Sequence, residues 1–180
     1  MPYHPRRRKK ALAFDSLECR RLLSVAPNDT YYSQQWGLNN ANDVDINAPE
    51  AWSLNTGSSS VVVAVIGPTG VDASNPDLAN RLWTNPTPNS DSRYLNALHG
   101  WNFDANSPNF TDTNGHDTNV AGIIAAQANN SQGIAGVTWG SPLMVLKASS
   151  LSAEAAAVDF AVAHGAKVIN LSVGWGESPS

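Results

Sequence analysis

The 180-residue sequence predicts an α/β fold in which a parallel sheet is flanked by helices. Three apolar runs, residues 61–66, 142–147 and 167–173, have the length of strands. They show no alternation of apolar and polar residues, which is typical of strands buried on both faces. The order strand, loop, helix, strand, helix, strand indicates right-handed crossovers between parallel strands.

A short helix is expected before the first strand, and a long loop after it. Pro49 favours a helix start, and Gly57 is the expected end of that helix. Residues 67–113 are rich in Asn, Asp, Pro and Ser, so we expect mostly loop there, with one extended piece near residues 99–103.

Two further helices are predicted between the later strands. Residues 116–127 form the first of them. The second opens at Ser152 as its N-cap and runs to about His164, with Glu154 in the first turn and Gly165 just past the end. Because sites in such folds lie at the carboxyl ends of the strands, the ends of the first and third strands are candidate site positions.

Charge divides the chain into two parts. Residues 1–25 hold seven of the eleven basic residues, whereas the rest of the chain has a net charge of −9. We expect residues 1–26 to be a basic, targeting-like segment or a disordered tail, and residues 27–180 to be a partial domain. The acidic domain disfavours nucleic acid and suits metal cations. No run of about 18 apolar residues predicts a membrane span, and the single cysteine, Cys19, excludes an intrachain disulfide.

Residues 114–123, NGHDTNVAGI, resemble the histidine motif of the subtilisin-like serine proteases, N-G-H-G-T-H-V-A-G-I. Further landmarks similar to that family follow one another in the same order between Asn28 and Gly176. They are PNDTYYS (27–33), VAVI (63–66), TGVD (69–72), NPDL (75–78), GWNF (100–103), NNSQGIAG (129–136) and GAKVINLS (165–172). The resemblance implies a three-layer subtilisin-like fold, here truncated, that serves peptide-bond hydrolysis.

The resemblance implies that His116 is the general base of a serine, histidine and aspartate triad. The aspartate should follow the first strand directly, as V-A-V-I-D-T-G, but Gly67 and Pro68 stand there. Asp117 replaces a glycine beside the histidine, and we expect it to favour a charged imidazole and to crowd the site. The 180 residues contain neither the serine motif G-T-S-M-A-x-P nor the oxyanion asparagine of A-A-G-N. They therefore hold one of four catalytic groups, and His116 could also be a leftover polar residue.

The segment Ser172, Val173 and Gly174 resembles the strand that pairs with the substrate backbone in this family. An alternative is a core strand that ends in a turn. The family's loop L-D-x-x-G-x-G after the second predicted strand is shortened here to residues 148–151, which removes part of a cleft wall.

The resemblance also implies a structural calcium site built from three distant segments. Hard oxygen donors, which calcium prefers, would come from the Asp29 and Asp77 carboxylates, the Asn130 side chain and the carbonyls of Gln127, Gln132 and Ile134. The alternative is a polar loop beside two unrelated surface acids.

We therefore expect part of a serine endopeptidase domain that is inactive as given and acts, if at all, on peptide or protein substrates. The alternatives are a noncatalytic, calcium-stabilised pseudoprotease that binds peptides, and a decayed gene fragment. Residues 14–24 resemble the LEPR-XLL segment of exported bacterial proteins, so an extracellular or cell-surface location is expected. We also expect apolar surface and a sheet edge to be left open.

Overall fold

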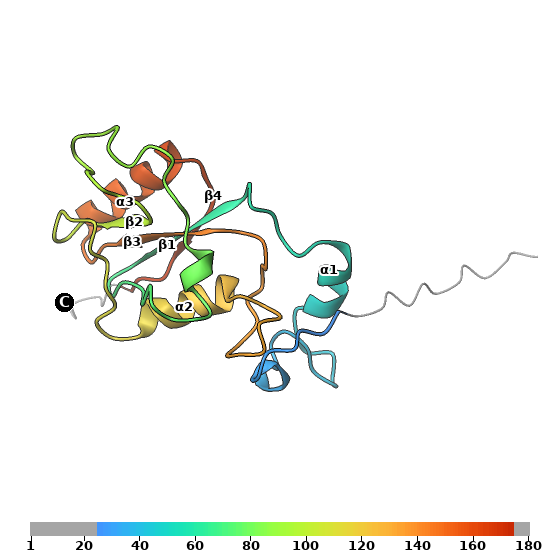
Figure 1. The fold of residues 1–180 in the computed structure, drawn as a ribbon. Helices are drawn as coiled ribbons and strands as arrows, with labels where there is room; N and C mark the ends of the chain where they lie inside the picture. Colours follow the sequence, from blue (N-terminus) through green and yellow to red (C-terminus); the bar gives the residue numbers. More distant parts are fainter. Residues whose placement is uncertain (1–24, 175–180) are drawn as a thin grey trace, which may run out of the picture.

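The computed structural model describes residues 25–174 and contains one parallel four-stranded sheet (Figure 1). Nearly all of the expected targeting-like segment, including the LEPR-XLL resemblance, lies outside the described residues. The spatial order of the strands is β2-β3-β1-β4, and every pairing is parallel. The strands are β1 (Val62–Gly67), β2 (Gly100–Asn102), β3 (Leu143–Lys147) and β4 (Ala166–Leu171).

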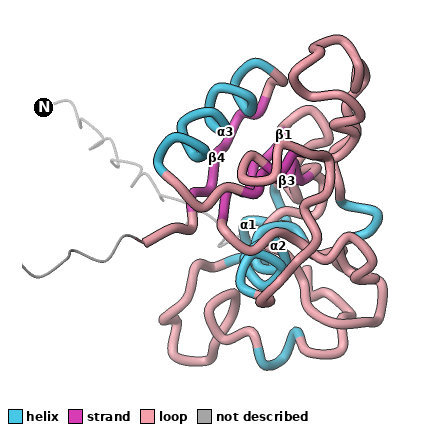
Figure 2. The backbone as a smooth tube through the Cα atoms, turned by 90° about the vertical axis from the view of Figure 1, so that its left-hand side faces the viewer, coloured by secondary structure: helices cyan, strands magenta, loops and turns pink. Residues whose placement is uncertain are grey.

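Helices cover both faces of the sheet, which confirms the predicted α/β class. The α-helices are α1 (Ala48–Leu54), α2 (His116–Ala125) and α3 (Leu151–Ala163), with short 3-10 turns η1 (Tyr32–Gln34) and η2 (Ala79–Arg81). Figure 2 shows the strands between α3 on one side and α2 on the other. In the described part of the chain, none of the helices has both the length and the apolar character needed to cross a membrane.

Alternate residues of the central strands form the two cores. Ala64 and Ile66 of β1 face α3 and pack in a cluster with Phe160. Val63 and Val65 face the opposite way and pack in a cluster with α2. Because side chains alternate across a strand, a run without polar residues is what two covered faces require.

Helix boundaries differ from the predicted ones at three places, one of which is the end of α2 at Ala125 instead of residue 127. The N-cap of α3 is Ser150, whose hydroxyl accepts a hydrogen bond from the N–H of Ala153 at 3.3 Å, so the helix begins one residue before Ser152. Helix α1 ends at Leu54, because Asn55 already has an extended backbone, and it does not reach Gly57. In each place the local backbone conformation selects the cap.

The prediction that the third strand is buried on both faces was wrong. This strand, β4, lies at the edge of the sheet, and Val168 and Leu171 expose 50% and 48% of their surface. Ile169 packs against the α3 core, whereas Val168, on the opposite face of β4, is half-exposed. An apolar run indicates strand length and affinity for burial, and it cannot distinguish an edge from a centre.

Candidate functional site

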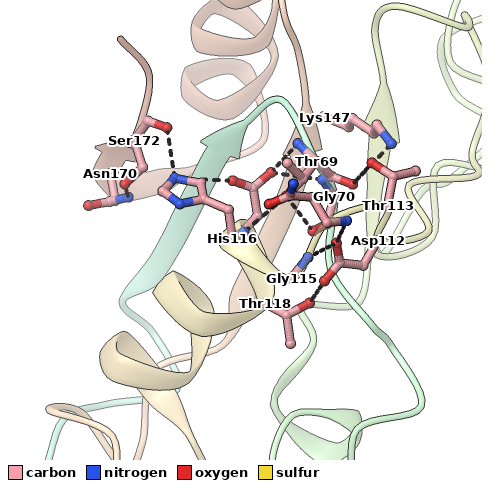
Figure 3. Close-up of polar contacts among 12 residues, drawn as sticks. Thr69, Gly70, Asp112, Thr113, Gly115, His116, Thr118, Lys147, Asn170 and Ser172 are labelled. Atoms are coloured by element: carbon pink, nitrogen blue, oxygen red, sulfur yellow. Dashed lines mark hydrogen bonds and ion pairs between the residues drawn. The ribbon is translucent and has the colours of Figure 1, made fainter.

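Helix α2 brings its first residue to the carboxyl end of the sheet. Gly115 precedes it with a φ of +90°, a conformation that glycine adopts at little cost, and His116 then opens the helix. The Nε2 atom of His116 lies 3.3 Å from the carbonyl oxygen of Ser172, just past the end of β4 (Figure 3). The structure thus brings together two of the predicted site residues that lie 56 positions apart.

His116 opens onto a cavity of about 340 Å³ at this end of the sheet. The imidazole side chain is 49% exposed, so solvent or a ligand can reach it. The predicted substrate-binding residues lie in the wall with it, and the lining is Pro68, Thr69, Asn114, His116, Ser149, Glu154, Ser172, Val173 and Gly174.

Glu154 is a wall residue whose place in the site was not predicted. The sequence identified it only as an acidic residue in the first turn of a helix, where a negative charge interacts favourably with the helix dipole. In the structure it is buried, and its Oε1 atom has no hydrogen-bond partner among the described residues. Helical periodicity could have placed it on the inner face of α3, but only the fold places that face beside His116.

Asp112 fixes the loop that leads into α2. Its carboxylate accepts hydrogen bonds from the N–H group of Gly115 at 2.7 Å and from the Thr118 hydroxyl (Figure 3). It also accepts one from the N–H group of Asn114 at 2.8 Å. Partial burial raises the pKa of the Asp112 carboxyl, but these hydrogen bonds together outweigh burial, so the pKa lies below its usual range. Asp112 therefore remains an anion that holds the helix start.

Asp117 lies deep at the carboxyl end of β1. Its side chain is buried, with 2% of the residue exposed. The Oδ2 atom accepts hydrogen bonds of 2.7 Å from the backbone N–H groups of Thr69 and Gly70, and the Asp117 N–H donates to the Thr69 hydroxyl at 3.0 Å. The carboxylate is therefore held by the turn that follows the strand.

The absence of a side chain at Gly67 makes room for this carboxylate. A Cβ atom built on Gly67 would lie 2.1 Å from the Oδ1 atom of Asp117, far inside any allowed contact. As expected, the end of the strand itself carries no carboxylate. The structure nevertheless places one beside it, because Asp117 of α2 points there. The expected crowding is also absent, since Asp117 turns inward over Gly67 and leaves His116 open to solvent.

Lys147, at the end of β3, braces the same turn from the other side. Its Nζ atom donates a hydrogen bond to the carbonyl of Thr69 at 3.0 Å (Figure 3). It donates another to the carbonyl of Thr111 at 3.2 Å. A positive charge on one side of the Thr69–Gly70 turn and the Asp117 carboxylate on the other keep this turn in one conformation.

The three segments of the predicted calcium site meet in the structure. Asp29 and Asp77 are 5% and 7% exposed, and neither carboxylate is paired with a basic side chain among residues 25–174. Asp29 accepts hydrogen bonds from the backbone N–H groups of Asn129 at 2.9 Å and Asn130 at 3.3 Å. Asp77 accepts from the Ile134 N–H at 3.0 Å and from the Asn130 side-chain amide at 2.7 Å. Two buried anions thus converge on one loop.

The carbonyl groups of this loop divide into two sets. Those of Ser131, Gly133 and Ala135 accept hydrogen bonds from the N-terminal segment. The three predicted calcium-binding carbonyls accept none from any described residue; they belong to Gln127, Gln132 and Ile134. Buried anions beside free carbonyls are the donor chemistry that suits calcium.

No cluster of three or more His, Cys, Asp or Glu side chains that could hold a metal occurs among the residues described. A cation at this loop would therefore depend on backbone and amide oxygens as well as the two carboxylates. Gly133 permits this arrangement, because a Cβ atom there would lie 1.8 Å from Asp77 Oδ2.

Comparisons with known proteins give consistent matches for the chain as a whole. The sequence profile described as the Subtilase family matches residues 58–180. The chain is 37% identical over 155 residues to the thermophilic serine proteinase of Bacillus sp. (strain AK1), covering 82% of this chain and 33% of that protein. It is 34% identical over 155 residues to thermitase of Thermoactinomyces vulgaris, covering 82% and 48%. The chain therefore spans between a third and a half of the length of these two curated relatives.

A solved structure from the proteases of Pseudoalteromonas arctica PAMC 21717 has a similar fold. It superposes with a TM-score of 0.68 at 24% sequence identity, covering 87% of this chain and 53% of that one. A likeness at this identity shows the fold alone, and it agrees with the parallel sheet and its two helical layers.

Proposed function

The chain belongs to the subtilase family, and we propose that it is the histidine-bearing part of a serine endopeptidase domain, with His116 as the general base. The observation that carries this proposal is the meeting of His116 and Ser172 in one cavity at the carboxyl end of the sheet. A general base must be reachable by the hydroxyl that it deprotonates, and the exposed imidazole meets that requirement.

The segment after β4 suits a substrate backbone. Strand β4 ends at Leu171, and the backbone groups of Val173 and Gly174 make no hydrogen bond to another described residue. An extended peptide can pair with such a free edge through main-chain hydrogen bonds. Because this edge lies in the same cavity wall as His116, a paired peptide would run past the imidazole.

Hydrolysis by the 180 residues alone is not expected. They contain neither the serine motif nor the oxyanion asparagine motif, and Gly67 and Pro68 stand at the strand position of the aspartate. The replacement at Gly67 and Pro68 also favours a second candidate, a noncatalytic module that binds peptides without cleaving them. A decayed gene fragment with neither property is the third.

A longer fusion protein, called the extended protein below, distinguishes the endopeptidase from the noncatalytic peptide-binding module. The 180-residue chain is joined in frame to the C-terminal part of a subtilase catalytic domain that carries the serine motif. Hydrolysis of a casein-derived peptide is measured, with His116→Ala as the test variant. We expect that variant to lose several orders of magnitude in turnover, because the base acts as a unit with the nucleophile.

Asn119→Ala is the matched control, since Asn119 is an exposed residue of the same helix that makes no hydrogen bond to the His116 side chain. It should retain hydrolysis. A folded extended protein that binds the peptide but does not cleave it would contradict the endopeptidase proposal and support the peptide-binding module. A folded protein that does neither would support the decayed fragment.

We also propose that the loop around Asn130 binds one structural calcium ion together with Asp29 and Asp77. The support is the pair of buried carboxylates without basic partners, held by a loop whose three predicted carbonyl ligands accept no hydrogen bond from a described residue. Calcium would offset the repulsion between the two anions and hold the N-terminal segment against the loop. For location we propose export from a bacterial cell, on the resemblance of residues 14–24 to the LEPR-XLL segment.

A further inference from the structure

We propose that Asp117 is the positioning carboxylate of His116, supplied from helix α2 in place of the aspartate that β1 lacks. Gly67 and Asp117 then form a reciprocal exchange, in which the strand carries the glycine and the helix carries the acid. The inference rests on the proposed role of His116. It assigns the positioning role to a residue whose predicted effect was to disturb the site.

The two oxygens of the Asp117 carboxylate have different environments. Oδ2 is held by the N–H groups of Thr69 and Gly70, which fixes the plane of the carboxylate. Oδ1 is also buried, yet it accepts no hydrogen bond from the described residues. Leaving a buried carboxylate oxygen unpaired is costly, so a side chain that only braced the turn would not need to place Oδ1 there.

The one charged or chargeable partner of Oδ1 in the described structure is His116, whose Nε2 atom lies 3.8 Å away. A movement of about 0.6–1 Å would convert this approach into a hydrogen bond, and catalytic contacts in apo sites are commonly long. The same Nε2 atom faces the Ser172 carbonyl at 3.3 Å. Two acceptors therefore converge on one ring nitrogen.

This environment selects a tautomer. A ring nitrogen that faces a carboxylate and a carbonyl carries the proton, so the neutral imidazole is protonated at Nε2, and Nδ1 is left as the basic nitrogen. When the ring accepts a second proton, the fixed carboxylate stabilises the imidazolium without itself being protonated. These are the two services that a positioning carboxylate gives to a general base.

Gly67 shows that the exchange is built into the packing. A Cβ at this position would meet the Oδ1, Cγ and Oδ2 atoms of Asp117 at 2.1, 2.5 and 2.6 Å. The strand end can hold a side chain of its own, or it can admit the Asp117 carboxylate, but it cannot do both. The buried position of Asp117 on the helix therefore requires a glycine at position 67 of the strand.

The test is the tautomer of the His116 ring in the 180-residue chain labelled with ¹³C and ¹⁵N, observed by two-dimensional NMR at a pH where the ring is neutral. In the Asp117→Asn variant the amide oxygen is retained by the Thr69 and Gly70 N–H groups, so the amide NH₂ takes the place of Oδ1. This donor opposes a proton on Nε2, which only the Ser172 carbonyl still favours, so the proton population shifts toward Nδ1. The tautomer ratio should change by roughly fivefold or more, the effect of one hydrogen bond.

Asp112→Asn is the matched control, because Asp112 holds the start of α2 but does not contact the imidazole. It should leave the ratio unchanged. An unchanged ratio in a folded Asp117→Asn chain would overturn the proposal, and so would equal changes in both variants.

A measurement on the unaltered chain keeps the test open if Asp117→Asn does not fold. The ¹³Cγ signal of Asp117 should shift at the pH at which the His116 ring gains its second proton; no shared step would also overturn the proposal. Neither measurement needs a nucleophile. A tautomer change without hydrolysis in the extended protein would therefore contradict the endopeptidase proposal but support the pairing of Asp117 with His116. Hydrolysis with an unchanged tautomer would support the endopeptidase proposal and contradict the pairing.

Discussion

The two ends of this molecule treat buried carboxylates in different ways. At the calcium loop, Asp29 and Asp77 remain at the positions that the family resemblance predicts, and backbone N–H groups of one loop hold both. At the carboxyl end of the sheet, the predicted strand position holds Gly67 instead of an aspartate, and the carboxylate of Asp117 on α2 occupies the adjoining space. A carboxylate can therefore change its place in the sequence while its place in space is kept.

The strongest way to break this comparison is to return an acid to the strand. Gly67→Asp alone should destabilise the chain by about 3–5 kcal/mol, because it puts a second charge and a clashing Cβ against buried Asp117. Equilibrium unfolding in urea measures this effect. The pair Gly67→Asp with Asp117→Gly should lose less stability than the sum of the losses in the two single variants, which is the sign of a direct coupling. Strict additivity of the two changes would show that the two sites do not share one space.

Calcium removal tests the other end. If the loop binds the ion, calcium at about 100 times its dissociation constant should stabilise the fold by roughly 2.7 kcal/mol, and a chelator should remove that increment. The measurement is the melting temperature with and without calcium. Asp77→Asn should abolish the difference, whereas Asp91→Asn should not, because Asp91 is paired with Arg93 on a separate surface loop. A calcium response that survives in Asp77→Asn would place the ion elsewhere.

How far the sequence predicts each end follows from how each is built. The sheet and its helices follow from local patterns whose order along the chain is informative. The meeting of Asp29, Asp77 and Asn130 was implied by the family resemblance. The role of Gly67 was not predictable, because a glycine in a strand does not indicate which residue packs against it, and Asp117 is 50 positions away. The exposure of β4 was also missed, since an apolar run carries no information about what lies beside it in space. Contacts between distant segments decide both features.

A smaller effect tests where α3 begins. The Ser150 hydroxyl accepts a hydrogen bond from the Ala153 N–H. Ser150→Ala should therefore lower the free energy of unfolding by about 1 kcal/mol through the loss of the N-cap. Ser152→Ala, two residues later, is the control and should cost much less. Urea unfolding of the two variants decides between them. A larger loss at Ser152 would restore the boundary that the sequence predicted.

The smallest expected effect concerns acid stability at the start of α2. Because the folded chain lowers the pKa of Asp112, its hydrogen bonds stabilise the fold at pH values above the unfolded pKa, about 3.9. That contribution is lost as the pH falls through the lower folded pKa, so the unaltered chain should lose stability in this range. Asp112→Asn should flatten that part of the profile while lowering stability at neutral pH. A stability profile with the same acid limb in both proteins would mean that Asp112 does not hold the entry to α2, and the comparison would then rest on Asp117 alone at that end.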